Sequence, residues 1–229
     1  MTKLNLIISL LVLTTQLVGA QSIESLKIKK YTQKNANGII TEFAEFLSLP
    51  NVASEPLGLR KNADFIMSMM NRKGIKNVQL LYGKTENIPP AVYGEILISG
   101  AKQTLIFYAH YDGQPVNPIQ WNQNLSPFIP KLYTAAIDKK GINIPFPLDG
   151  KYNNEWRIYV RRASDDKAGV AAIINAYEAV NKSELKPKYN LKFFFEGEEE
   201  KGSTHLNEIL QKNAALLQSD LWIIGDGPV

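Results

Sequence analysis

Apolar residues recur along most of the chain at one of two spacings, helical or strand-like. Helical spacing is found at 39–47 before Pro50, at 65–70 before Gly74, at 170–180 and at 206–217. Apolar positions at this period are typical of amphipathic helices, and Pro or Gly commonly follows a helix end. The sequence therefore predicts four helices that each bury one face.

Strand-like patterns occupy five shorter segments, 78–82, 92–98, 104–109, 189–195 and 221–225. The segment 104–109, TLIFYA, is continuously apolar, which is typical of a strand buried on both faces of a sheet. Strands and helices alternate in the second half of the chain, so we expect right-handed connections and parallel pairing. The predicted fold class is α/β, with a mainly parallel sheet flanked by helices.

Residues 117–155 interrupt this alternation. They are rich in Pro, Asn and Gly, which predicts a long excursion of loops and hairpins. A loop of this length inside a compact domain usually has a function, unless it contains elements that the pattern conceals.

The composition is that of a globular protein. The chain has 229 residues, of which 45% are hydrophobic and 21% charged, and this excludes a disordered tail, a coiled coil or a fibre. The formal net charge of +4 falls to +3 without residues 1–20, which contribute only Lys3. The lysines at 182, 186, 188 and 192 lack interleaved aromatic residues, so no nucleic-acid partner is expected.

The first twenty residues have the pattern of a signal peptide. Lys3 precedes the apolar run LNLIISLLVLTTQLVGA, and Val18 and Ala20 stand at the −3 and −1 positions of a cleavage site. The alternative is an uncleaved anchor, but the run is short for a membrane span and is polar at 14–16. We expect a signal peptide at 1–20, export to the periplasm or medium, and no stable membrane span afterwards.

The absence of cysteine restricts the chemistry that the chain can perform. With no Cys, disulfides, thiolate nucleophiles, iron–sulfur clusters and cysteine zinc sites are all excluded. A metal would have to be bound by Asp, Glu and the two histidines, His110 and His205. His205 lies within a helical pattern without an acidic partner in register, so we expect it to be structural.

Polar clusters follow three of the predicted strands and open one predicted helix. They are His110-Tyr111-Asp112, Ser164-Asp165-Asp166-Lys167, Glu196-Gly197-Glu198-Glu199-Glu200 and Asp226. In an open parallel sheet the carboxyl ends of the strands meet at one edge, where ligands bind. We therefore expect these side chains to converge, although they span more than a hundred residues.

Each cluster also has a simpler explanation. A single His after a strand is commonly a loop residue, and Asp165 could cap the following helix. Three glutamates in a row are often a solvated helix start, favoured by the helix dipole. However, a buried strand that delivers adjacent carboxylates to one point concentrates negative charge, which a cation or protonation must relieve.

Oxygen ligands with one imidazole suit divalent zinc or manganese, and two such ions can share a carboxylate. The corresponding chemistry is hydrolysis by a metal-activated water, with a nearby carboxylate as general base. Asp112, two residues after His110, is placed to accept the other ring N–H of that imidazole.

Four strings together resemble the M20 family of metallopeptidases. They are AHYDGQP at 109–115, RRASDDKAG at 161–169, FEGEEEKGS at 195–203 and SDLWIIGDGP at 219–228. Their order and spacing agree with the family, and HYDGQP is closer to its carnosinase-like dipeptidase branch. The resemblance implies that 21–229 is the N-terminal portion of a three-layer catalytic domain that binds two metal ions.

The resemblance also implies roles for particular residues. It makes His110 and Asp226 ligands of the first metal, Asp165 the bridging carboxylate, Glu200 a ligand of the second metal, and Glu199 the general base. It further implies a cis peptide bond between Asp165 and Asp166. The expected activity is cleavage of dipeptides or short peptides; the alternatives are an amidohydrolase that deacylates N-acyl amino acids, and an inactive binding fragment.

One departure from the family pattern affects these expectations. In the family a lid domain and a final His ligand follow at about the position where this sequence stops. We therefore expect an incomplete second metal position and weak or no activity in this chain. The lid would also mediate a homodimer in a longer form.

Overall fold

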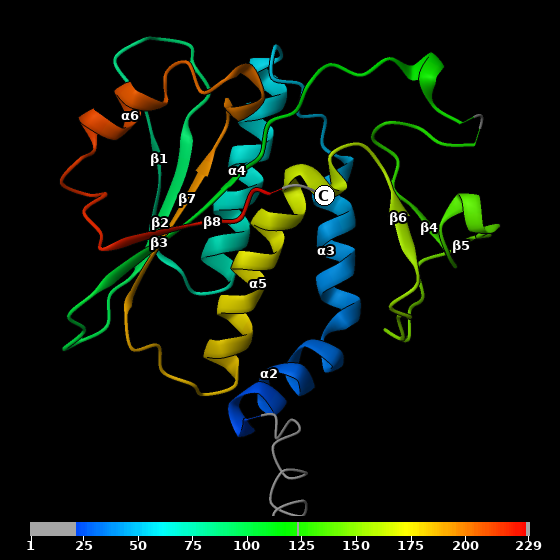
Figure 1. Ribbon diagram of the computed structural model, residues 1–229, viewed down its shortest axis with the longest axis horizontal. Coiled ribbons are helices and arrows are strands. Elements are labelled where there is room, and N and C mark those ends of the chain that lie inside the picture. Colours follow the sequence, from blue (N-terminus) through cyan, green and yellow to red (C-terminus); the bar gives the residue numbers. More distant parts are fainter. Residues whose placement is uncertain (1–21, 123, 228–229) are drawn as a thin grey trace, which may run out of the picture.

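A five-stranded sheet forms the centre of the molecule (Figure 1). The computed structural model describes residues 22–122 and 124–227, so the expected signal peptide lies outside the described residues. Along the sheet the strands follow the order β1 (Lys76–Leu81), β2 (Ala91–Ile96), β7 (Asn190–Glu196), β3 (Thr104–His110) and β8 (Leu221–Ile224).

The directions of the strands confirm the predicted α/β class. β3 is parallel to β7 on one side and to β8 on the other, whereas β2 is antiparallel to both β7 and β1. Four of the five strands thus share one direction, and β2 alone opposes them. The parallel strands end together, which places the residues after β3, β7 and β8 at one edge.

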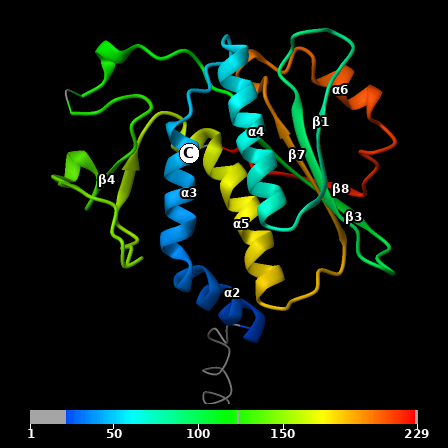
Figure 2. The same ribbon diagram turned by 180° about the vertical axis from the view of Figure 1, so that it is seen from behind.

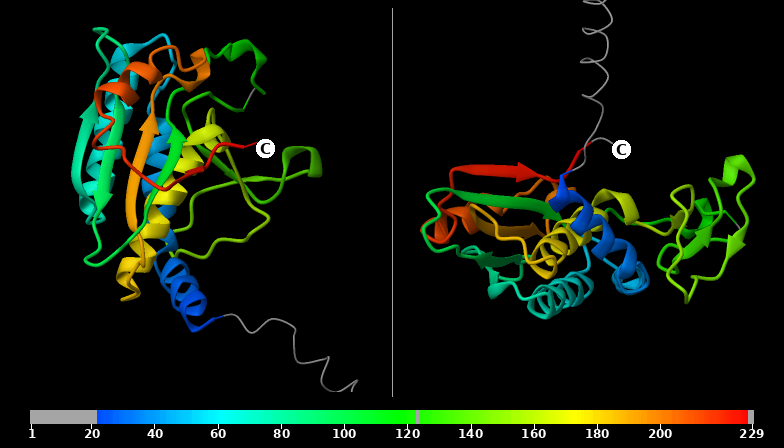
Figure 3. Two further views of the ribbon diagram at one scale, coloured as in Figure 1. Left: turned by 60° about the vertical axis from the view of Figure 1, so that its left-hand side comes forward. Right: turned by 90° about the horizontal axis from the view of Figure 1, so that it is seen from below.

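Helices cover both faces of this sheet (Figure 3). The helices are α2 (Ile23–Lys34), α3 (Ala36–Ser48), α4 (Pro56–Arg72), α5 (Gly169–Lys182) and α6 (Leu206–Lys212). Side chains of α3, α4 and α5 share one apolar core with Phe193 and Phe195, while α6 packs against Phe194 on the other face. This alternation along β7 produces the expected three layers.

The sequence explains α4 in particular detail. Pro56 occupies its first turn, where a missing N–H costs nothing, and Gly74 follows its end with a φ of 87°. Its buried apolar positions are Leu59, Ala63, Ile66, Met69 and Met70. Gly94 of β2 permits close packing, since a Cβ there would lie 2.5 Å from Met70 Cε.

Two helical expectations need correction. The helix expected at 206–217 ends at Lys212, and α2 was not anticipated at all. α2 buries none of its residues, so it lacks the apolar stripe on which a prediction from periodicity depends. Ser22 caps it instead, by accepting a hydrogen bond from the Ser25 N–H.

The excursion at 117–155 contains the expected hairpin, which a strand just beyond it extends to a small sheet. β4 (Lys131–Tyr133) pairs antiparallel with β5 (Asn143–Ile144) and with β6 (Arg157–Tyr159). Figure 2 shows this small sheet beyond α3, apart from the main sheet. Among the described residues, no helix is long and apolar enough to cross a membrane.

Candidate metal centre

Three side chains from distant parts of the chain meet at the carboxyl edge of the sheet. His110 ends β3, Asp226 follows β8, and Asp165 lies in the segment 163–168 that leads into α5. Each offers one ligand atom within 4.8 Å of the other two. The His110 Nε2 atom lies 2.9 Å from Asp165 Oδ1 and 4.0 Å from Asp226 Oδ2. The convergence expected from the strand ends is present for these three residues.

Asp112 holds the imidazole in this orientation. Its Oδ1 atom lies 3.2 Å from Nδ1 of the fully buried His110. The same carboxylate accepts the backbone N–H groups of Glu199 and Glu200, each at 3.1 Å. Asp112 therefore links the end of β3 to the segment after β7, and it leaves Nε2 of the imidazole facing the other carboxylates.

The negative charge around His110 changes its protonation. Burial by itself lowers the pKa of the imidazole, but the hydrogen bond to Asp112 and the charges of Asp112, Asp166 and Glu199 outweigh it and raise the pKa to about 9. A positive charge is thus favoured at the centre of the cluster. A divalent ion at Nε2 would supply that charge in place of the proton.

Asp165 and Asp166 are adjacent but differ in their surroundings. Asp166 is buried; its Oδ2 accepts the His110 backbone N–H at 3.2 Å and its Oδ1 accepts the Gly169 N–H at 3.1 Å. Burial raises the pKa of Asp166 to about 6. The capping role considered for Asp165 thus belongs to Asp166, and the side chain of Asp165 is 49% exposed and faces His110. The peptide bond between the two is cis, as the resemblance implies.

The three glutamates after β7 have three different partners. Glu199 Oε2 lies 3.7 Å from His110 Nε2, and burial raises the pKa of Glu199. Glu198 binds His205, with Oε2 2.9 Å from Nδ1. The expectation that His205 has no acidic partner is therefore wrong, because Glu198 reaches it from the preceding turn.

Glu200 lies outside the group of three ligands and pairs with Arg162, a residue that the sequence reasoning missed. The Arg162 Nη1 atom hydrogen-bonds Glu200 Oε1 and lies 3.9 Å from Asp165 Oδ2. Burial lowers the pKa of Arg162, whereas the charges of Glu200 and Asp165 raise it. The available signal was the arginine pair that immediately precedes Ala163-Ser164-Asp165 in the sequence.

The donor set fits a divalent metal at the first position. His110 offers a buried imidazole nitrogen, and Asp165 and Asp226 offer partly exposed carboxylates. One nitrogen and hard oxygen donors suit zinc or manganese. Glu199 remains beside the same imidazole without a cationic side chain bonded to it among the described residues.

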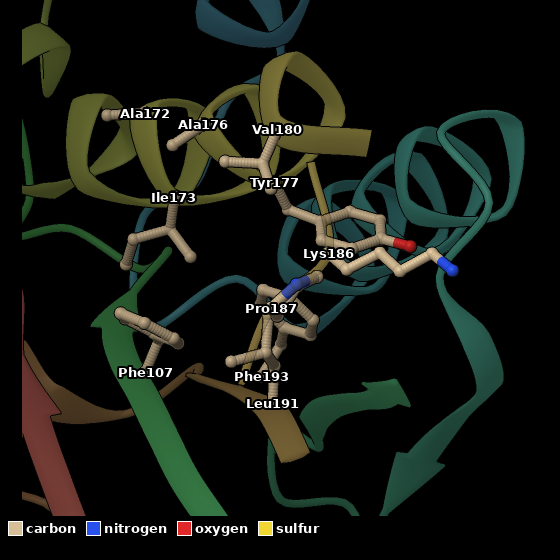
Figure 4. A pocket seen from close by; sticks show the side chains of 10 residues that line it. All are labelled: Phe107, Ala172, Ile173, Ala176, Tyr177, Val180, Lys186, Pro187, Leu191 and Phe193. Carbon is tan, nitrogen blue, oxygen red and sulfur yellow. The ribbon is translucent and has the colours of Figure 1, made fainter. Parts of the chain in front are cut away.

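An apolar cavity elsewhere in the molecule is unsuited to binding a metal ion. A cavity of about 480 Å³ lies between α5 and the strands β3 and β7, toward the start of β7 (Figure 4). Its lining is almost entirely apolar, as with Phe107, Ile173 and Leu191, and Lys186 is its charged member. Within the part of the chain that the structure describes, no acid or imidazole lines it.

Comparisons with known proteins identify the family of the chain. Residues 106–229, more than half of the chain, match the profile of Peptidase family M20/M25/M40. A Cys-Gly metallodipeptidase of Schizosaccharomyces pombe is 27% identical over 198 residues, which cover 82% of this chain and 37% of that protein. A Beta-Ala-His dipeptidase of Homo sapiens is 31% identical over 157 residues, which cover 63% and 26%.

A solved structure has a similar fold. The M20 family metallo-carboxypeptidase of Sulfolobus solfataricus superposes with a TM-score of 0.63 at 31% identity, covering 83% of this chain and 38% of that one. The chain spans about a third of the length of the curated relatives it matches.

Proposed function

The chain belongs to peptidase family M20/M25/M40, and from this premise we propose that its carboxyl-edge cluster binds a divalent metal and hydrolyses short peptides. The observation that supports this proposal is the convergence of one imidazole and two carboxylates within 4.8 Å of one another. Exposed acids alone are common without a metal, whereas a buried, oriented imidazole facing two carboxylates is typical of zinc and manganese sites.

The residues have separable roles in this proposal. His110, Asp165 and Asp226 hold the ion, and Asp112 keeps Nε2 of the imidazole directed toward it. A bound zinc or manganese ion makes water a stronger nucleophile near neutral pH. Glu199 accepts the proton of that water as general base, because its raised pKa brings it closer to the pH of operation.

A second ion stays a prediction from the family resemblance. It would need Asp165 as a bridge and Glu200 as a ligand. In the structure the guanidinium of Arg162 lies between these two carboxylates. The proposed function therefore depends on the first metal site, formed by His110, Asp165 and Asp226.

The proposed substrates are dipeptides. The matched relatives named above are a Cys-Gly metallodipeptidase and a Beta-Ala-His dipeptidase, and both names describe small peptide substrates. An amidohydrolase acting on N-acyl amino acids would use the same metal and base, so it is the alternative within this chemistry. A protein that binds metal without turnover is the alternative outside it.

Hydrolysis by the full chain tests the proposal. The protein is stripped of metal, reloaded with zinc or manganese, and offered dipeptides and N-acetyl amino acids while released amino acid is measured. We expect weak, chelator-sensitive release from dipeptides, in keeping with the incomplete second metal position, and Glu199→Gln should abolish it at unchanged zinc content, because general-base catalysis contributes about 10²- to 10⁴-fold. Glu86→Gln, an equal charge change at an exposed residue, is the matched control.

Several outcomes would contradict this proposal. Turnover by Glu199→Gln at the wild-type rate would remove its role as base. Faster release from N-acetyl amino acids would identify a deacylase, and zinc binding without hydrolysis of either class would identify a binding protein.

We also propose export and, for a longer form, a homodimer through a lid domain. Export is supported by Lys3, the apolar run that follows, and the small residue Ala20 at its end. Amino-terminal sequencing of the protein recovered from periplasm or medium should show a start at Gln21. An intact amino terminus in the cytoplasmic fraction would contradict export.

A further inference from the structure

We propose that the guanidinium of Arg162 takes the place of a second metal ion, so that this site binds a single ion at high affinity. This inference rests on the proposed metal site. It departs from the expectation of two ions, and it concerns the position between Asp165 and Glu200.

Arg162 lies where a second cation would have to lie. Its Nη1 atom hydrogen-bonds Glu200 Oε1 and is 3.9 Å from Asp165 Oδ2, whereas the other oxygen of Asp165 faces His110 at 2.9 Å. One face of Asp165 is thus directed to the proposed metal and the other to a guanidinium. A cation that bridges two carboxylates in this way relieves the same repulsion that a metal would.

The chain backbone is adapted to place the arginine there. Arg162 has a φ of 62° and a ψ of 24°, a left-handed conformation that is unfavourable for a side chain of this kind. Gly113 leaves the necessary room, since a Cβ at that position would lie 2.5 Å from Arg162 Nε and 2.9 Å from its Cγ and Cδ. Two separate segments therefore cooperate to bring one guanidinium to Glu200.

Burial makes this ion pair hard to displace. The side chains of Arg162 and Glu200 are 7% and 8% exposed, in contrast to 30% for Asp226 at the first position. A metal that bound Glu200 would leave a buried guanidinium without its counter-ion, beside a new positive charge. Arg162 Nε and Nη2 have no hydrogen-bond partner within the described part of the chain, so charge rather than a hydrogen-bond network holds the group in place.

Substitution of Arg162 by glycine tests the inference at a position whose backbone glycine tolerates. Glycine adopts a positive φ freely, so Arg162→Gly avoids backbone strain while it removes the whole side chain, and urea denaturation checks that the variant is folded before zinc is added. The full chain and its variants are titrated with zinc alone by calorimetry, and zinc per chain is measured by elemental analysis. Arg162→Lys retains a cation at the same position, and Arg161→Ala removes the adjacent charge as a control.

We expect one tightly bound zinc in the wild type, in Arg161→Ala and in Arg162→Lys. In Arg162→Gly a second zinc should bind at least about tenfold more tightly than in the wild type, because a like charge near the ligands has been removed. Two tightly bound ions in the wild type, or an unchanged second affinity in Arg162→Gly, would overturn the inference. Failure of every form to bind the first zinc would instead overturn the proposed function on which it rests.

Discussion

Two acidic segments lie at the sheet edge, 163–168 and 198–200. They differ in the groups that stabilise their closely spaced carboxylates. In the first, Asp166 accepts hydrogen bonds from the backbone N–H groups of His110 and Gly169. In the second, Glu198 and Glu200 pair with the side chains of His205 and Arg162. Each segment leaves one carboxylate directed toward His110, Asp165 in the first and Glu199 in the second.

This difference separates what the fold fixes from what a substitution can change. Backbone N–H groups are present whatever the neighbouring side chains are, so the environment of Asp166 depends on the path of the main chain. Glu200 pairs with the side chain of Arg162, and Glu198 pairs with the ring of His205 besides accepting its backbone N–H, so one substitution can remove the side-chain partner of either carboxylate. The segment 198–200 is therefore the adjustable half of the site, and 163–168 is the rigid half.

The largest expected effect is the loss of zinc affinity when Asp165, the carboxylate of 163–168 that faces His110, is replaced. Asp165→Asn should lower zinc affinity by more than about 100-fold, because even residues that only orient a ligand are worth roughly 10- to 100-fold. Its side chain is half exposed, so the free energy of unfolding should change little. Calorimetry with zinc and urea denaturation measure the two quantities. Asp64→Asn, an exposed aspartate on α4, is the control, and equal zinc affinity in the two variants would contradict the assignment.

The next largest effect is expected at Lys167, which ties the segment 163–168 to the end of α3. Its fully buried Nζ donates to the carbonyl oxygens of Phe46 and Leu49 at the end of α3, each at 2.8 Å. Lys167→Met should cost about 2–4 kcal/mol of unfolding free energy, since two buried carbonyls lose their partner. It should also weaken zinc binding, because 163–168 carries Asp165.

Lys192 provides a matched control for this prediction. Its Nζ donates to two main-chain carbonyls in the same way, those of Leu216 and Gln218, each at 2.7 Å. Lys192→Met should destabilise the protein and leave zinc affinity unchanged. Equal losses of zinc affinity in the two lysine variants would show that the effect is general destabilisation and not positioning of Asp165.

A smaller loss of stability is expected from Asp166 itself. Asp166→Ala removes the acceptor of the Gly169 N–H at the start of α5 and leaves the buried His110 N–H without its acceptor. Each of these losses costs about 1 kcal/mol, so we expect a total of about 2 kcal/mol in urea denaturation. Asp138→Ala, in the separate small-sheet region, is the control. A neutral result would mean that the backbone partners do not fix this segment.

The fold was largely predictable because its signals are local. The apolar runs at 104–109 and 189–195 identify β3 and β7, and their parallel pairing is confirmed. The reversed direction of β2 has no such signal, since apolar patterning does not record which neighbour a strand selects. The hairpin expected within 117–155 is present, but the positions of its strands could not be read, because two or three residues cannot establish a period.

The sequence indicates which side chains gather at the sheet edge, but it does not indicate which of them contact one another. Strand ends identified His110 and Asp226, and a spacing of two residues identified Asp112. The division between Asp165 and Asp166, and the approach of Arg162 to Glu200, depend on a left-handed residue and on room at a distant glycine. Neither condition can be read from residue types alone.

The smallest expected effect tests the adjustable segment directly. Glu198 is buried; it accepts the His205 backbone N–H at 2.9 Å and pairs with the partly exposed ring of His205. Glu198→Gln keeps an acceptor for the N–H and removes only the charge, so the loss should be about 1 kcal/mol or less, since the hydrogen bond is kept. Zinc affinity should stay at the wild-type value, because Glu198 is not among the three proposed ligands.

Urea denaturation of Glu198→Gln beside Asp166→Ala makes the comparison of the two segments quantitative. A loss as large as that of Asp166→Ala would show that side-chain partners fix an acid as firmly as backbone partners do, and the distinction between the two segments would fail.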